Sequence, residues 1–325
     1  MTATVPATDT DDVSDHVSGV RPAGPSDPGA VPPHALRRVI ETALEEDAPW
    51  GDVTSETLIP VEARATATLT AREPGVLSGG EVFAAVMQAV DPAVRTELHL
   101  SDGRTFAAGQ VLATVEGPAR SVLRAERVGL NLVQRMSGIA TVTAQYVAAV
   151  AGTGTRVADT RKTTPGLRAL ERYAVRCGGG HNHRNSLSDA VLAKDNHLAV
   201  LLAGGTSIGD AVRDARGRLG HTVHLEVEVD RLDQVEPVVS AGVDTIMLDN
   251  FTPEQLVEGV RLVAGRALVE ASGGVSLETV GAIARTGVDV VSVGALTHSA
   301  RALDLGLDID VTAALAGDGA RVTGG

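Results

Sequence analysis

The 325-residue sequence has little cysteine, few aromatic side chains and no long apolar run. Its single cysteine, Cys177, excludes an internal disulfide and is typical of a reducing compartment. No apolar run approaches the roughly 18 residues of a membrane-spanning helix. The first residues also lack the basic-then-apolar order of a signal peptide. We therefore expect a cytoplasmic protein with no membrane segment.

Positive charge is also scarce, because 28 Lys and Arg face 41 Asp and Glu and give a formal net charge of −13. Proteins that bind nucleic acid attract phosphates with net positive charge, and those that bind single strands stack bases on aromatic rings. Aromatic residues are only 2% of this chain, so we expect no nucleic-acid partner. The remaining composition, 43% hydrophobic and 21% charged, is typical of a globular enzyme.

Three stretches of different character follow one another along the chain. Residues 1–33 are acidic and rich in Pro, Gly, Ser and Thr, which predicts a disordered tail. Residues 34–129 contain strand-like alternation between residue 63 and about residue 115, with predicted helices on either side of it and one within it. Strands with helices to one side predict an α+β domain. The last of these helices is predicted over residues 123–136.

Residues 130–299 alternate strand-like and helical segments, which predicts parallel strands with helices outside them. Such units build either a barrel or an open doubly wound sheet. The segment 223–230 favours the barrel, because Glu226, Glu228 and Asp230 share one of its faces. Both faces of a doubly wound sheet pack against helices and should be apolar. An edge strand with one wetted face is the alternative.

Basic residues are concentrated between residues 156 and 184, where seven of them face two acids. Guanidinium groups bind carboxylates and phosphates through paired hydrogen bonds, so this cluster predicts an anion site. Arg161 and Lys162 follow a strand-like segment directly, and barrel enzymes place functional groups at such strand ends. Arg172 and Arg176 are expected instead on the solvated face of a helix.

Later strand ends carry acids and glycines. Carboxylates such as Glu228 and Asp249, at neighbouring strand ends, can hold a hydrated Mg²⁺ ion that also binds substrate phosphates. Gly273, Gly274 and Gly294 offer backbone N–H groups to a phosphate. Together with the basic cluster, they predict one site for a carboxylated substrate and a magnesium-bound phosphorylated substrate.

Some motifs are open to more than one interpretation. Lys194 ends a short apolar run and could be the Schiff-base nucleophile of an aldolase-type barrel or a fixed charge for an anion. His181 and His183 could be metal ligands, although oxygen ligands form the better-supported metal site in this chain. The glycine loops alone would also suit a non-catalytic phosphate-binding barrel.

Taken together, the motifs resemble those of the quinolinate phosphoribosyltransferase family over roughly residues 34–310. The most specific is the string Asp159-Thr160-Arg161-Lys162-Thr163-Thr164-Pro165-Gly166-Leu167-Arg168. The others are Glu46-Asp47 with Gly51-Asp52-Val53-Thr54, Glu126-Arg127 with Asn131 and Ser137-Gly138, Gly178-Gly179-Gly180 with Asn182-His183-Arg184, Lys194-Asp195-Asn196-His197, Glu226-Val227-Glu228, Leu248-Asp249-Asn250, Glu270 with Ser272-Gly273-Gly274, and Gly294 with His298.

The resemblance implies an α/β fold: an incomplete, six-stranded α/β barrel and an N-terminal α+β open-faced sandwich domain, which residues 300–325 rejoin. It implies phosphoribosyl transfer from phosphoribosyl pyrophosphate to quinolinate with decarboxylation. The products are nicotinate mononucleotide, pyrophosphate and CO₂, and the reaction belongs to de novo NAD biosynthesis. It also implies dependence on Mg²⁺ and a homodimer.

The resemblance further implies a role for each matching residue. Quinolinate would be bound by Arg161, His183, Arg184 and Lys194, together with Arg127 from the neighbouring subunit. Phosphoribosyl pyrophosphate would be bound by Lys162, Glu228, Asp249, Ser272, Gly273, Gly274, Gly294 and His298. Catalysis would fall to Lys162, Lys194, Glu228 and Asp249, and the two acids of this set would hold Mg²⁺. Ser186 stands where we expect a glycine.

A relative of the same fold with another acceptor is the nearest alternative, either a molybdenum-transport-associated protein or a nicotinate phosphoribosyltransferase. Nicotinate carries one carboxylate, however, and does not need three arginines and a histidine.

Overall fold

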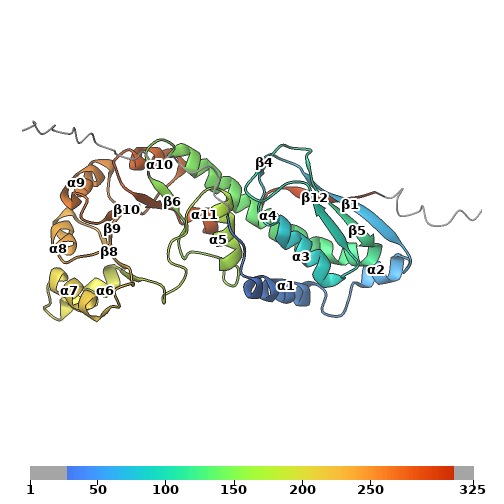
Figure 1. Ribbon diagram of the computed structural model, residues 1–325, viewed down its shortest axis with the longest axis horizontal. Helices are drawn as coiled ribbons and strands as arrows, with labels where there is room; N and C mark the ends of the chain where they lie inside the picture. The colour runs from blue at the N-terminus through green and yellow to red at the C-terminus, as the bar shows by residue number, and fades with distance from the viewer. Residues whose placement is uncertain (1–27, 311–325) are drawn as a thin grey trace, which may run out of the picture.

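The computed structural model describes residues 28–310, so most of the predicted tail, residues 1–27, lies outside the described part, as do residues 311–325. Residues 28–32 contain no helix or strand, and helix α1 (Pro33–Asp47) follows them directly. The structure is elongated, with an N-terminal domain at one end and a barrel at the other (Figure 1).

The N-terminal domain is built on an antiparallel sheet with the strand order β12-β1-β5-β3. The alternation predicted from residue 63 is confirmed in β1, where buried Ala65, Ala67 and Leu69 alternate with partly exposed threonines. Helix α4 packs against this sheet and α3 packs against α4, which leaves the sandwich open on its other face. The elements are α2 (Val53–Leu58), β1 (Arg64–Ala71), β2 (Gly75–Val76), α3 (Gly80–Val90), β3 (Arg95–Leu98), β4 (Thr105–Phe106), β5 (Val111–Pro118), α4 (Ala119–Ala149) and β12 (Leu305–Asp310).

Helix α4 links the two domains and is longer than the predicted helix over residues 123–136 (Figure 1). The buried side chains of α4 continue beyond residue 136 with Ile139 and Tyr146, so the helix extends past the predicted end. Gly138 lies within it, and the main chain at Arg301 packs so close that a Cβ atom there would overlap the carbonyl oxygen, so the position requires glycine. The domain boundary predicted between residues 129 and 130 lies inside this unbroken helix.

Six parallel strands form the second domain, in the order β6-β11-β10-β9-β8-β7. Strands β7 to β11 follow one another in a single direction, whereas the order of a doubly wound sheet reverses at its centre. Right-handed crossovers then place their helices on one face, as in a barrel. Strands β6 and β7 stand at opposite ends of the order, so the barrel is incomplete, as predicted.

The elements of the barrel alternate along the chain as the sequence predicted. They are β6 (Arg156–Ala158), α5 (Arg168–Cys177), β7 (Val191–Ala193), α6 (Asp195–Ala203), α7 (Ile208–Arg218), β8 (Leu225–Val229), η1 (Leu232–Gln234), α8 (Val235–Val239), β9 (Thr245–Asp249), α9 (Pro253–Val263), β10 (Leu268–Ser272), α10 (Leu277–Ala284), β11 (Val290–Ser292) and α11 (Ala295–His298). Among the helices of residues 28–310, none is both long and apolar enough to cross a membrane.

The acids of β8 lie inside the barrel. Glu226 and Glu228 are buried, and β8 is paired on both sides, with β7 and with β9. The alternative of a wetted edge strand is therefore wrong. Glu270 of β10 is buried in the same way, so the barrel contains several carboxylates that require partners.

Candidate active site

A cleft of about 690 Å³ opens where the barrel strands end. It collects residues that follow β6, β7, β9, β10 and β11, which is where barrel enzymes carry their chemistry. The predicted site residues on its wall are Arg161, Lys162, His183, Arg184, Lys194, Asp249, Ser272, Gly273, Gly274, Gly294 and His298.

Two predicted residues lie off this wall. Glu228 is buried in the barrel and forms an ion pair with Lys194, which places it directly behind the cleft. Arg127 is exposed on α4 and is not among the cleft-lining residues of its own chain.

A second cleft, of about 580 Å³, lies between the N-terminal domain and α5 and contains none of the predicted residues. Its carboxylate, Asp102, accepts hydrogen bonds from the N–H groups of Gly79 and Gly80 and from the hydroxyl of Tyr173. Because these bonds join two parts of the fold, we assign Asp102 a structural role.

Arg161 and Arg184 form the basic wall of the first cleft. In each, the Nε atom is buried and has no hydrogen-bond partner. Burial lowers the pKa of Arg184, and the nearby charge of Arg161 lowers it further. Two cations with unused donors favour the binding of an anion, because unpaired buried donors are costly.

The other basic residues of the segment serve the fold. Arg172 forms an ion pair with buried Asp159, at 3.3 Å, and its side chain is only 12% exposed. Arg176 donates to the carbonyl oxygen of Pro28, at 2.7 Å, and to Asn182, at 2.6 Å. The predicted placement of both on a solvated helix face was wrong, because the loop around residue 182 folds back over α5.

Lys162, Gly294 and His298 meet at one corner of the cleft. The hydroxyl of Thr297 donates to the carbonyl oxygen of Lys162, at 2.8 Å, and fixes the main chain there. A Cβ atom at Gly294 would lie 3.0 Å from His298 Nε2 and 3.1 Å from Lys162 Cδ. A glycine at this position therefore keeps the corner open between two basic side chains.

The opposite wall carries Asp249 and the glycine pair. Asp249 accepts hydrogen bonds from the hydroxyl of Ser272, at 2.5 Å, and from the amide of Asn250, at 2.6 Å. Gly273 has φ 89°, and a Cβ atom there would overlap Asn250. The wall thus offers a held carboxylate beside exposed main chain, and its oxygen atoms are of the type that Mg²⁺ prefers.

Lys194 is not the desolvated amine that Schiff-base chemistry uses. Its ammonium group is paired with the carboxylate of Glu228, and its side chain is 45% exposed. This arrangement suits a fixed positive charge at the cleft.

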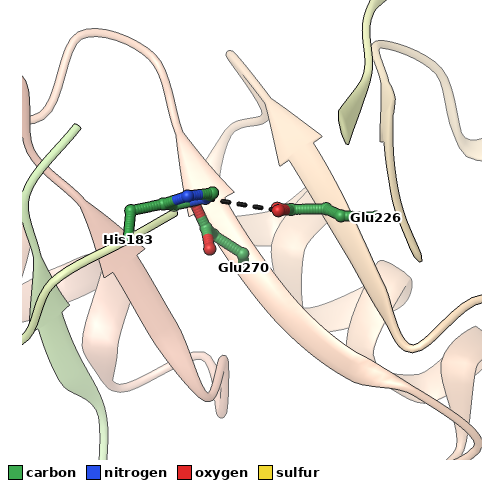
Figure 2. Close-up of side chains that lie close together, drawn as sticks. All are labelled: His183, Glu226 and Glu270. Carbon is green, nitrogen blue, oxygen red and sulfur yellow. Dashed lines mark ion pairs between the residues drawn. The ribbon is translucent and has the colours of Figure 1, made fainter. Parts of the chain in front are cut away.

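His183 lies between two buried carboxylates (Figure 2). Its Nε2 atom is 3.2 Å from Glu226 and 3.5 Å from Glu270. Burial opposes protonation of the ring, but these carboxylates outweigh it and raise the pKa of His183 to about 10. Burial also raises the pKa of Glu226.

The other ring nitrogen of His183, Nδ1, accepts a hydrogen bond, and this contact also concerns the protonation of the ring. The N–H group of Arg184 donates to Nδ1, at 2.7 Å, which requires a lone pair on Nδ1, whereas a fully charged ring would carry a proton there. This hydrogen bond favours a ring with a lone pair on Nδ1, whereas the two carboxylates favour the charged ring. Both carboxylates lie within ion-pair distance of Nε2 and favour a proton on the ring.

Sequence reasoning placed Glu270 only among the strand-end acids and assigned no role to Glu226 and Asp159, although all three lie in motifs that carry the family resemblance. The shared face of Glu226 and Glu228 in the segment 223–230 was the available signal. Asp159 accepts a hydrogen bond from the N–H group of His183, at 2.8 Å, and no pattern in the sequence indicates this contact.

Comparisons with known proteins agree with this geometry. Residues 139–308 match the quinolinate phosphoribosyl transferase C-terminal domain, and residues 52–137 match the N-terminal domain. The chain is 40% identical, over 85% of its length and 94% of the other, to the probable nicotinate-nucleotide pyrophosphorylase (carboxylating) of Bacillus subtilis. It is 45% identical to the Mycobacterium leprae nicotinate-nucleotide pyrophosphorylase (carboxylating), over 85% of this chain and 97% of that one. The crystal structure of NadC from Streptococcus pyogenes matches with a TM-score of 0.82 at 39% identity, over 87% of this chain and 99% of the other.

Proposed function

The chain belongs to the quinolinate phosphoribosyltransferase family, and from this premise we propose that it transfers the phosphoribosyl group of phosphoribosyl pyrophosphate to quinolinate. The products are nicotinate mononucleotide, pyrophosphate and CO₂, in the de novo synthesis of NAD. The observation that carries the proposal is the pair Arg161 and Arg184, whose unpartnered buried donors belong to a cleft that also contains a carboxylate and glycine loops.

Quinolinate has two adjacent carboxylates, and two adjacent guanidinium groups match them. Each arginine can form paired hydrogen bonds to a carboxylate, and Lys194 adds a further positive charge on the same wall. These contacts orient the pyridine nitrogen toward the phosphoribosyl donor, which is the main contribution that positioning makes to a two-substrate reaction.

The donor fits the opposite side of the cleft. Main-chain N–H groups at Gly273, Gly274 and Gly294 suit its 5′-phosphate, Lys162 adds a positive charge for phosphate oxygens, and His298 adds a ring nitrogen beside it. Glu228 and Asp249 are the residues that would hold Mg²⁺, largely through water and the pyrophosphate. The ion would neutralise the charge that develops on the leaving pyrophosphate.

The chemistry needs no general base from the protein. The pyridine nitrogen attacks the anomeric carbon as the bond to pyrophosphate breaks, and the nearby carboxylates stabilise the positive charge on the ribose. The pyridinium ring formed in this way accepts the electron pair when the bond from C2 to its carboxylate breaks. CO₂ then leaves, and C2 takes a proton from water.

The direct test is release of CO₂ from quinolinate labelled at its 2-carboxylate. We expect release only when phosphoribosyl pyrophosphate and Mg²⁺ are both present, with one pyrophosphate formed per CO₂. Donor binding without turnover would instead support a non-catalytic phosphate-binding barrel. Trapping of a carbonyl substrate on Lys194 by borohydride would support an aldolase.

We also propose a homodimer in which Arg127 completes the partner's cleft. Trp50 and Val53, before and within α2, are 93% and 77% exposed, and α2 contacts α4, which carries Arg127. Val200 of α6 is 77% exposed, and α6 begins directly after Lys194 at the cleft. A two-fold dimer that pairs these surfaces would bury both apolar patches and bring Arg127 to the cleft.

Subunit mixing tests the shared site. Arg127→Ala and Lys162→Ala proteins should each be inactive, and a mixed dimer should regain activity because one of its two clefts is intact. The expected recovery is about a quarter of wild-type activity after random exchange, since half of the dimers are mixed and each has one intact site. No recovery, with exchange shown by a labelled subunit, would contradict the proposal.

The single cysteine supports a cytoplasmic location as part of the same proposal.

A further inference from the structure

Glu171 is a buried acid of α5 for which the proposed chemistry has no use. Its side chain is only 1% exposed, and both of its carboxylate oxygens have partners. Oε1 accepts a hydrogen bond from Nη2 of Arg135, at 2.8 Å. Oε2 accepts one from the main-chain N–H group of Thr164, at 3.0 Å. Thr164 follows Lys162 by two residues, so Glu171 holds the main chain of the segment that carries this lysine.

Arg135 reaches the same corner of the cleft from α4, which both α5 and α11 contact (Figure 1). Its Nη1 atom donates to the carbonyl oxygen of Ala300, at 2.9 Å, and its Nη2 atom donates to the carbonyl oxygen of Thr297. These carbonyl groups lie in the last turn of α11 and just after it, where main-chain oxygens have no partner within the helix. Arg135 therefore holds the end of α11, which carries His298.

The hydroxyl of Thr297 connects these two sets of contacts. Thr297 is fully buried, and its hydroxyl donates to the carbonyl oxygen of Lys162, at 2.8 Å. The ion pair of Arg135 and Glu171 is therefore joined by hydrogen bonds to the main chain on both sides of the corner.

Stability alone does not require this ion pair. The desolvation of a buried pair often exceeds its Coulombic gain, and apolar side chains of similar volume can stabilise a fold equally well. Apolar side chains, however, could not form hydrogen bonds to the segment at Thr164 and to the end of α11. The contacts of Arg135 and Glu171 thus indicate a role in positioning.

We propose that Arg135 and Glu171 are positioning residues for the binding of phosphoribosyl pyrophosphate, because they fix the places of Lys162 and His298. Neither of the two lines the cleft, so both act through the main chain of the segments that they hold. The inference rests on the proposed function for its ligand. It adds that affinity for the donor depends on an ion pair outside the cleft, whereas affinity for quinolinate does not.

Variants at Thr297 test the connection and leave the ion pair in place. Thr297→Val removes the hydroxyl and keeps the branched shape of the side chain. We expect it to raise Kd for phosphoribosyl pyrophosphate with Mg²⁺ about 10-fold while Kd for quinolinate changes less than about 2-fold. Thr297→Ser keeps the hydroxyl and should change the donor Kd less than about 3-fold. Calorimetric titration measures both affinities.

Thr155→Val is the matched control. Thr155 is also buried, and its hydroxyl also donates to a main-chain carbonyl oxygen, that of Val288, at 2.8 Å. It lies directly before β6, at the end of the barrel opposite the cleft. We expect the two Thr→Val variants to lower Tm similarly and only Thr297→Val to lose donor affinity. The same donor affinity in both variants would overturn the proposal.

Arg135→Lys tests the ion pair itself. It keeps a positive charge beside Glu171, but one ammonium group cannot replace the planar fork that reaches Glu171 and two carbonyl oxygens together. We expect the donor Kd to rise about 5-fold or more and the quinolinate Kd to stay within about 2-fold.

A fall in Tm of Arg135→Lys with both affinities unchanged would overturn the proposal, because the pair would then only stabilise the fold. Equal loss of the two ligands would also overturn it. If the wild-type protein does not bind phosphoribosyl pyrophosphate with Mg²⁺, the proposed function fails and this inference fails with it. If wild type, Thr297→Val and Arg135→Lys bind the donor equally well, the inference alone fails.

Discussion

Two pairs of arginines within 24 residues of sequence differ in their hydrogen-bond partners. Arg172 and Arg176 belong to α5, and their donors are used by Asp159, Asn182 and the carbonyl oxygen of Pro28. Arg161 and Arg184 lie at the cleft, and each has a buried Nε atom without a partner. The charge is the same in both pairs, so charge alone does not define the anion site. Arg161 and Arg184 differ from the other pair in having unused donors and in lining the cleft.

The largest expected effect is on quinolinate affinity at the cleft pair. Arg161→Ala or Arg184→Ala should weaken quinolinate binding about 100-fold, because each removes a charge-assisted bidentate contact. Affinity for phosphoribosyl pyrophosphate with Mg²⁺ should change less than about 2-fold, since its groups bind elsewhere in the cleft. Calorimetric titration measures both, with Arg213→Ala on exposed α7 as the control. Equal loss of both ligands would show that the two sides of the cleft are not separate.

The next prediction concerns stability, and it distinguishes Arg172 and Arg176, whose donors are used within the fold, from Arg161 and Arg184 at the cleft. Arg172→Ala leaves Asp159 buried without its cation and should lower the free energy of unfolding by about 2 kcal/mol. The loss is limited because the N–H group of His183 and the amide of Asn182 still donate to Asp159. Urea unfolding measures it beside Arg161→Ala, which should lose less than about 0.5 kcal/mol. A larger loss of stability in Arg161→Ala than in Arg172→Ala would contradict the roles assigned to the two pairs.

Removal of Mg²⁺ should affect the binding of the two substrates differently. With excess EDTA, we expect affinity for phosphoribosyl pyrophosphate to fall about 10-fold or more while quinolinate affinity stays within about 2-fold. The reason is that in the proposed site arginines, and not the carboxylates assigned to Mg²⁺, contact the carboxylates of quinolinate. Calorimetric titrations of each ligand with and without excess EDTA measure the two affinities. Addition of Mg²⁺ in excess over the EDTA is the control. Loss of quinolinate affinity alone would contradict the division.

The last effect concerns Cys177, which follows Arg176, and it is absent at neutral pH. Burial raises the pKa of its thiol to about 11, against an ordinary value of about 8.5 in the unfolded chain. A pKa raised by folding gives stability that is complete below about pH 8.5 and is lost as the pH rises toward 11. The unfolding free energy of wild type should therefore fall relative to Cys177→Ala only in that interval. A difference that grows as the pH falls below 7 would show that the basic segment activates the thiol.

Much of the site follows from the sequence because parallel strands bring their C-terminal ends together. Once the strand and helix series was recognised, Lys194, Asp249 and Ser272 had to meet at one edge, and the cleft contains them. The shared face of Glu226 and Glu228 likewise placed both inside a barrel. Periodicity and strand order carry this information without any side-chain detail.

The partners of buried polar groups do not follow from the sequence. Whether Arg172 faces solvent or Asp159 depends on a loop that returns from residue 182, and no local pattern encodes that return. The orientation of His183 depends on two strands that lie more than 40 residues away in sequence. The close approach of the chain at Arg301, which requires a glycine at position 138 of α4, also has no signal in the local sequence.

The central claim is that Arg161 and Arg184 recognise a second carboxylate. Its most direct test is the affinity of the intact protein for quinolinate and for nicotinate, which has only one, by calorimetric titration under the same conditions. The unused donors predict that quinolinate binds at least about 30-fold more tightly, because nicotinate leaves one guanidinium unpaired. Equal affinities for the two acids would contradict the claim.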